Sequence, residues 1–188
     1  FDTGPGNGLL DQWCQQHKTT PYDASGAWAA TGTVDTALLT ALLADPFFST
    51  KPPKSTGREY FNLRWLERIA QRHALPLTAT HDIQATLAQL TATTIIDSLQ
   101  SWGGELQALI VCGGGRLNDD LMRRLRKASI GLTYTPDLVE PSEYWNIDGD
   151  AIEAAAFAWL AHRRLENLPG NVPRVTGASG ERVLGAIY

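Results

Sequence analysis

The chain has 188 residues, enough for one domain with a sizeable core, and its 43% hydrophobic and 19% charged residues exclude a disordered chain. The formal net charge of -4 argues against a basic nucleic-acid-binding protein, and two cysteines are too few for a disulfide framework. No apolar run approaches the length of a membrane span. We therefore expect a globular cytoplasmic protein.

The first third of the chain has the pattern of short helices joined by polar loops. Apolar spacing predicts helices over residues 9–16 and 34–43. The stretch between them, 19–33, is rich in Thr, Gly, Ser and Ala and predicts a loop. Asp45-Pro46 ends the second helix, and the prolines after it predict an irregular connection.

Two longer helices follow. Asn62 is a good N-cap for a helix over 62–73 that carries Leu66 and Ile69 on one face. Thr80 or Asp82 begins a longer helix with apolar positions up to Leu99. The six tryptophans mostly fall at apolar helical positions, so we expect them in the core.

The last part alternates strands and helices. ALIVC, residues 108–112, predicts a buried strand, in which Cys112 packs as a small hydrophobic residue. A helix from about Asn118 to Arg126 and a second strand over 130–134 follow. Asp148 or Asp150 begins the helix AIEAAAFAWLAHRRL, and the tail is mostly loop. This order predicts an α/β fold with a partly parallel sheet.

The first seven residues, FDTGPGN, form a glycine-rich loop with a carboxylate at its start. Gly4 and Gly6 allow a ligand close to the backbone, and Asn7 can cap the next helix. Asp2 stands where a strand would end, so it can hold a metal through water or act as a general base. It can also stabilise the loop as an Asx-turn.

A second glycine-rich stretch, GGGRLN, follows the strand over 108–112. Gly113, Gly114 and Gly115 open the backbone, and Asn118 can cap the next helix or donate to a ligand. A tight strand-to-helix turn with no ligand fits these residues equally well.

Other candidate groups also leave two interpretations open. Glu153 lies in a helix that is apolar on nearly every side, which suits a polar cavity, or it favours the helix dipole from the first turn. KSTGREYFN, residues 54–62, includes Arg58 and Glu59 and can clamp a polar ligand such as a sugar or form a self-contained Ω-loop. The four histidines show no metal-ligand spacing, so we predict no metal ligands among them.

Five stretches, taken in order, resemble the C-terminal half of the anhydro-N-acetylmuramic acid kinases. They are FDTGPGN, KSTGREYFN, VCGGG with Asn118, DAIEAAAFAWLA and NLPGNVPRVTGA. The resemblance implies an actin/Hsp70/sugar-kinase-like (ribonuclease H-like) fold with a mixed sheet flanked by helices. Residues 1–188 would form a single C-terminal lobe, and the N-terminal lobe would be absent.

The resemblance also implies a reaction. Such kinases use ATP and Mg²⁺ to open the bridge of 1,6-anhydro-N-acetylmuramic acid with water and to phosphorylate O6. The product is N-acetylmuramic acid 6-phosphate, in peptidoglycan recycling. The chain alone would be inactive, its partner would be the missing N-terminal half, and a homodimer is implied.

The same resemblance implies roles for particular residues. Asp2 matches the general base that activates water, and Glu153 matches a glutamate of the sugar pocket. Arg58 and Glu59 match structural or pocket-lining groups. The nucleotide-binding groups would be Gly4, Gly6, Asn7, Gly113, Gly114, Gly115 and Asn118.

Two other functions remain open at this point. Another sugar or acetate-type kinase of the same superfold would phosphorylate an ordinary hydroxyl and would not need Asp2 to activate water. A non-catalytic nucleotide-binding module would bind ATP without turnover.

Overall fold

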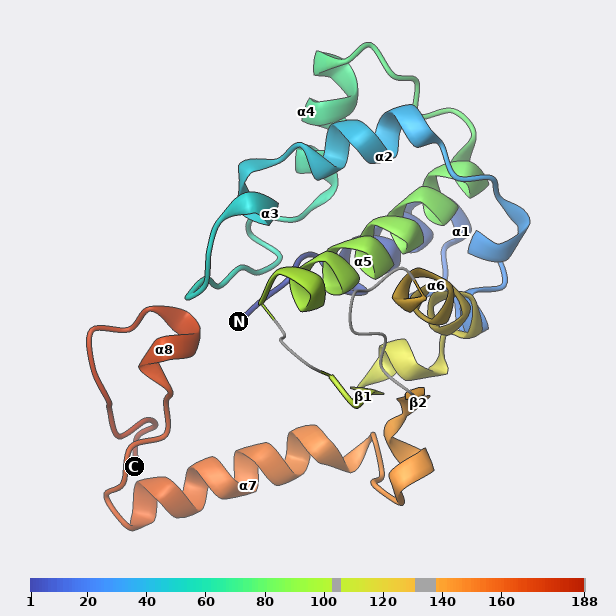
Figure 1. The fold of residues 1–188 in the computed structure, drawn as a ribbon. Coiled ribbons are helices and arrows are strands. Elements are labelled where there is room, and N and C mark those ends of the chain that lie inside the picture. The colour runs from blue at the N-terminus through green and yellow to red at the C-terminus, as the bar shows by residue number, and fades with distance from the viewer. Residues whose placement is uncertain (103–105, 131–137, 188) are drawn as a thin grey trace.

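The computed structural model describes residues 1–102, 106–130 and 138–187 and is rich in helix (Figure 1). Its helices are α1 (Gly8–Lys18), α2 (Thr36–Leu43), α3 (Pro46–Ser49), α4 (Leu63–Arg72), α5 (Thr80–Trp102), α6 (Asp119–Ser129), α7 (Ala151–Leu165) and α8 (Pro173–Thr176). Its strands are β1 (Ala108–Val111) and β2 (Leu138–Pro141). Short 3-10 turns are η1 (Ala24–Gly26), η2 (Ala29–Thr31), η3 (Gly114–Leu117) and η4 (Ser142–Trp145). The α/β class predicted from the sequence is confirmed.

Helix α4 forms where its sequence predicts it. The Asn62 side chain accepts a hydrogen bond from the Trp65 N–H at 3.1 Å, which satisfies one of the free amides at the start of the helix. Trp65, Leu66 and Ile69 are buried on the face that packs into the core. The predicted cap and apolar face are both confirmed.

Helix α5 runs through the centre of the molecule and joins two parts of the core (Figure 1). Ile83, Leu87 and Leu90 belong to a cluster that includes buried residues of α1, α2 and α4. Ala92 and Ile96 belong to a second cluster with α6 and β2. Within the described ranges no helix, α5 included, has both the length and the hydropathy needed to cross a bilayer.

The two described strands form a parallel pair. Ala108 pairs with Leu138 and Val111 with Pro141, and α6 connects the strands, as in a βαβ unit. The strand predicted over 130–134 lies almost entirely outside the described residues, and β2 forms further along, in a segment for which the sequence predicts no strand. The mixed sheet and the single C-terminal lobe stay predictions.

Several local predictions are wrong. Cys112 is exposed rather than buried, because β1 ends at Val111 and the chain turns at Gly113, where φ is +67°. The sequence predicts an irregular segment after Asp45, but this segment begins with α3, because Pro46 favours the first helical position and the Asp45 side chain accepts from the Phe47 N–H. The tail is mostly loop, as predicted, and α8 is a helix of only four residues within it.

Helix α7 is set apart from the helices around α5 (Figure 1), and none of its residues is buried. Arg116 links its start to η3 and η4, through ion pairs to Asp150 at 2.9 Å and to Glu143 at 2.6 Å. The helix begins as predicted after Asp150, although the Asp150 side chain makes no capping hydrogen bond. Its tryptophan, Trp159, is 51% exposed, whereas Trp13 and Trp65 lie in the core as predicted.

Candidate functional site

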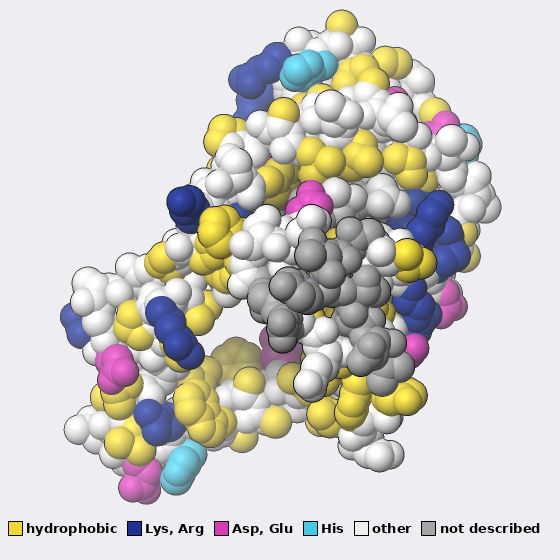
Figure 2. Space-filling model, viewed as in Figure 1, with side chains coloured by type: hydrophobic (Ala, Val, Ile, Leu, Met, Phe, Trp, Pro, Cys, Tyr) yellow, Lys and Arg dark blue, Asp and Glu magenta, His cyan; other side chains and the backbone are white. Residues whose placement is uncertain are grey.

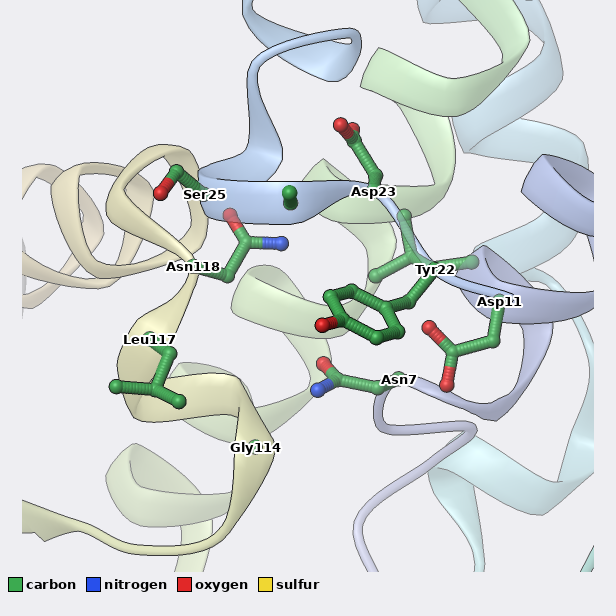
Figure 3. Close-up of a pocket in the computed structure, with 10 residues that line it drawn as sticks. Asn7, Asp11, Tyr22, Asp23, Ser25, Gly114, Leu117 and Asn118 are labelled. Carbon is green, nitrogen blue, oxygen red and sulfur yellow. The ribbon is translucent and has the colours of Figure 1, made fainter. Parts of the chain in front are cut away.

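The glycine-rich loop at the start of the chain borders two cavities. The larger has a volume of ≈ 370 Å³ and is drawn in Figure 3. It is lined by Asn7 and Asp11 at the start of α1, by residues 22–25, and by Gly114 and Asn118 of the second glycine-rich stretch. The two glycine-rich stretches, which are far apart in the sequence, therefore meet at one cavity.

The smaller cavity has a volume of ≈ 240 Å³ and is lined by more residues of the loop. It is lined by Asp2, by Gly4 and Gly6, and by residues 56–58 of the KSTGREYFN stretch. Arg58 also lies beside Gly8, since a Cβ on Gly8 would be 3.7 Å from the Arg58 Nε. The structure thus brings together Asp2, the first glycines and Arg58.

Asn7 connects the loop to the second glycine-rich stretch. It occupies the N-cap position of α1, as predicted, but its side chain makes no capping hydrogen bond. Figure 3 shows this side chain extending toward the turn that holds Gly114. A Cβ on Gly115 would lie 3.5 Å from both polar atoms of the Asn7 side chain, so the small residue allows the close approach.

Asn118 has the capping role that its position predicts. Its Oδ1 accepts a hydrogen bond from the Leu121 N–H at 2.9 Å at the start of α6. The same side chain lines the larger cavity, so the cap also fixes one wall. Gly26 of η1 packs against it so closely that a Cβ would overlap Asn118 Oδ1.

The two cavities differ in charge. Asp11 and Asp23 line the larger one, but the Asp23 carboxylate points away from the other lining side chains (Figure 3), and its two oxygens accept the N–H groups of Trp28 and Ala29 at 2.9 Å. Burial raises the pKa of Asp11, and the positive charge of Arg58 opposes part of this rise. Among the described residues that line the two cavities, Arg58 alone is cationic, and it lines the smaller one.

Asp2 is held by the KSTGREYFN stretch. Its Oδ2 accepts hydrogen bonds from the Ser55 hydroxyl and the Thr56 N–H, each at 2.8 Å. Its own N–H donates to the Lys54 carbonyl at 3.3 Å. Residues 54–56 are therefore bonded to the first loop, which a self-contained Ω-loop would not require.

Two predicted residues do not join this site. Glu153 is exposed on α7 and lines neither cavity. Glu59 is also exposed, and its carboxylate lies next to Gly57 rather than in a cavity. Their roles at a sugar pocket stay predictions.

The sequence does not predict several residues of the larger cavity. Tyr22, Asp23 and Ser25 belong to a stretch interpreted only as a loop. For Asp11 the sequence does contain a pattern that indicates a place in this cavity, because Asp11 follows Asn7 by four residues and so lies on the same helical face.

A magnesium ion fits the residues near Asp2. The described part of the chain holds no group of three or more His, Cys, Asp or Glu side chains placed to bind a metal by themselves. Magnesium keeps several waters and needs only one or two carboxylates plus phosphate oxygens. No described residue donates to Oδ1 of Asp2, so that oxygen is free to accept a hydrogen bond from a water, including one bound to magnesium, beside the glycine-rich loop.

An α/β chain with two glycine-rich turns that lead into helices and meet at one cavity is typical of proteins that bind phosphorylated ligands. The family model of anhydro-N-acetylmuramic acid kinase matches residues 1–188. The chain belongs to the anhydro-N-acetylmuramic acid kinase family.

Individual relatives agree with this assignment. Anhydro-N-acetylmuramic acid kinases of Pseudomonas syringae pv. tomato, Cupriavidus pinatubonensis and Xanthomonas campestris pv. campestris are 53%, 51% and 51% identical to the chain. Each match covers 100% of this chain but only 50%, 49% and 48% of the relative. The chain thus spans about half the length of the curated relatives it matches.

Proposed function

We propose that this chain is the C-terminal lobe of a kinase that converts 1,6-anhydro-N-acetylmuramic acid to N-acetylmuramic acid 6-phosphate with ATP. The observation that carries the proposal is the position of Asp2. Its carboxylate lines one cavity with Gly4, Gly6 and Arg58, and the same loop borders the cavity that holds Asn7 and Gly114. A base, a phosphate-binding loop and a nucleoside-sized cavity thus adjoin one another.

The charges suggest how ATP lies across the loop. The larger cavity has carboxylates and the ring of Tyr22 but no described cation, so it suits an uncharged nucleoside better than phosphates. The smaller cavity has Arg58 and the open backbone of Gly4 and Gly6, which suit phosphate oxygens. We place the adenosine in the larger cavity and the terminal phosphate in the smaller.

In the proposed reaction Asp2 takes a proton from water as the water oxygen attacks the anomeric carbon. The bond from that carbon to the bridging oxygen breaks. The freed oxygen, O6 of the sugar, takes the γ-phosphoryl group, and ADP leaves with the bonding electron pair. The other hydrogen of the water remains on the new anomeric hydroxyl.

The rest of the proposal follows from this reaction. Bound magnesium would neutralise charge on the phosphates. Phosphate oxygens and water would hold it, and the Asp2 carboxylate would contact it only through a bound water, which leaves Asp2 free to act as the base. The N-terminal half of the kinase would supply the remaining groups, so we expect the chain alone to be inactive. We further propose a cytoplasmic location, where ATP is available, and a homodimer.

The test uses a fusion protein. It joins this chain to the half of the Pseudomonas syringae relative that the chain does not match. ADP release is measured with ATP, MgCl₂ and 1,6-anhydro-N-acetylmuramic acid, for the chain alone and for the fusion. Release by the fusion only, and only with the anhydro sugar, supports the proposal. If ADP is released with a sugar that offers an ordinary hydroxyl instead, the result favours another kinase of the superfold. If the fusion binds ATP but releases no ADP, the result favours a non-catalytic module.

Asp2→Asn in the same fusion tests the base. The amide has the size of the carboxylate but cannot take the proton, so we expect turnover to fall by at least about 100-fold, within the range for a general base. ATP binding, measured by calorimetry, should stay. Normal turnover in this variant would falsify the base assignment.

A further inference from the structure

Residues 54–56 form a cradle around Asp2. Ser55 and Thr56 both donate to the same carboxylate oxygen, Oδ2, at 2.8 Å. Because two donors of different direction meet at one oxygen, the carboxylate cannot rotate without breaking one of these hydrogen bonds. The other oxygen, Oδ1, receives no hydrogen bond from the described residues and stays available to a substrate.

Lys54 attaches residues 54–56 to the neighbouring helix α3. This side chain is only 6% exposed, and its ammonium donates to the Phe47 carbonyl at 2.9 Å and lies 4.6 Å from the centre of the Phe47 ring. Burial lowers the pKa of Lys54. Its backbone carbonyl also accepts the Asp2 N–H. The segment beside Asp2 is thus fixed to α3.

Ser55 is different from Lys54 because it is exposed. An exposed hydroxyl adds little to the core, and the bond from Ser55 to Asp2 joins residues that are 53 positions apart. The described contact of the Ser55 hydroxyl is therefore with the candidate base rather than with the surrounding packing.

We propose that Ser55 is a positioning residue for Asp2: with the Thr56 N–H it holds Oδ2, so that Oδ1 is the oxygen that takes the proton from water. This inference rests on the proposed function. Fixed orientation of a base raises the rate of the chemical step, whereas substrate binding does not depend on it. The mark of positioning is therefore a change in kcat without a change in KM.

The experiment compares three variants of the fusion described above. In Ser55→Ala we expect kcat to fall about 10-fold, with KM for ATP and for the anhydro sugar within about twofold. Ser55→Thr keeps the hydroxyl and should recover most of kcat. Ser49→Ala is the control, since Ser49 is also exposed but donates to the Pro46 carbonyl instead of to a carboxylate.

A second readout does not depend on turnover. In the chain labelled with ¹³C at the aspartate carboxyls, the Asp2 resonance, assigned with Asp2→Asn, should move in Ser55→Ala and stay in Ser49→Ala. An unmoved resonance overturns the contact. A moved resonance with unchanged kcat overturns the positioning role while leaving the proposed function intact.

The activity of the unsubstituted fusion separates the two ideas. If it releases no ADP, the proposed function fails, and the positioning role fails with it. If it is active and Asp2→Asn is inactive, the result for Ser55→Ala decides the inference alone.

Discussion

Gly26 shows how one residue can decide the shape of the larger cavity. Its φ is +67°, and a Cβ there would overlap Asn118 Oδ1 and come within 2.8 Å of the Asp120 Cβ. Asn118 cannot move aside freely, because its Oδ1 caps α6. An alanine would therefore add backbone strain and also disturb a helix cap.

We predict that Gly26→Ala lowers the free energy of unfolding by about 2–3 kcal/mol, the sum of left-handed strain and a lost cap. Gly6→Ala is the matched control. Its φ is +55°, but nothing lies within 4 Å of the position of a Cβ, so it should cost only about 1–2 kcal/mol, from strain. Urea unfolding measures both, and equal losses would mean that the contact with Asn118 does not matter.

Asp97 gives a prediction about pH. The residue is exposed, but it lines a small hollow with Thr94, Ser98 and Trp102, and partial desolvation there raises its pKa above the ordinary 3.8. Because the Asp97 pKa is higher in the folded than in the unfolded state, the folded state binds more protons in the pH range around these two pKa values. Protonated Asp97 therefore contributes stability to the folded state. This contribution is fully present below pH 3.8 and is lost as the pH rises through the pKa of Asp97 in the folded state.

We therefore expect Asp97→Asn to flatten the fall in stability between acid and neutral pH and to be more stable than the unsubstituted chain at pH 7. Chemical unfolding at a series of pH values is the measurement. Asp11→Asn is the comparison, and its effect should be smaller because Arg58 opposes the rise in the Asp11 pKa. A slope that Asp97→Asn leaves unchanged would contradict the prediction.

At the scale of elements, α5 supports the first glycine-rich loop. Thr91 Oγ1 donates to the Gly6 carbonyl at 2.8 Å, and a Cβ on Gly4 would lie only 2.8 Å from Thr94 Oγ1. Thr91 and Thr94 are both buried, so the helix surface under the loop cannot easily move. The loop is thus shaped by the helix behind it as well as by its own glycines.

This contact can be tested by a double-mutant cycle. Gly4→Ala should destabilise the chain by about 1–3 kcal/mol through overpacking. In a Thr94→Ala background the clash with Oγ1 is gone, so we expect the same substitution to cost about 1 kcal/mol less, a coupling typical of neighbours. Additive effects in urea unfolding would show that the loop and α5 are independent.

The elements also separate what the sequence could predict from what it could not. The start of α4 and the start of α6 were predictable because Asn62 and Asn118 bond to amides three residues away. The bond from Ser55 to Asp2 spans 53 residues, so no local pattern encodes it. Tyr22 lines the larger cavity only because its loop folds back toward Gly114, and the loop composition carries no sign of this.

At the scale of the whole molecule, α7 exposes an apolar surface that the described residues do not cover. Phe157 is 64% exposed and Trp159 51% exposed, and Ile110 on β1 is 42% exposed. Figure 2 shows apolar side chains at the surface in the part of the molecule where α7 and α8 lie. A helix that is apolar on nearly every side is usually buried, and parallel strands are usually covered on both faces.

The lengths of the relatives suggest what covers this surface, because half of each relative has no counterpart in this chain. We predict that in the fusion the emission of Trp159, assigned with Trp159→Phe, shifts to shorter wavelength and that amide exchange in α7 slows, as expected when a surface helix becomes packed. Exchange in α4 should not change, since Trp65, Leu66 and Ile69 are already buried. If α7 exchanges at the same rate in both proteins, the remaining half does not pack on it, and its apolar face serves another contact.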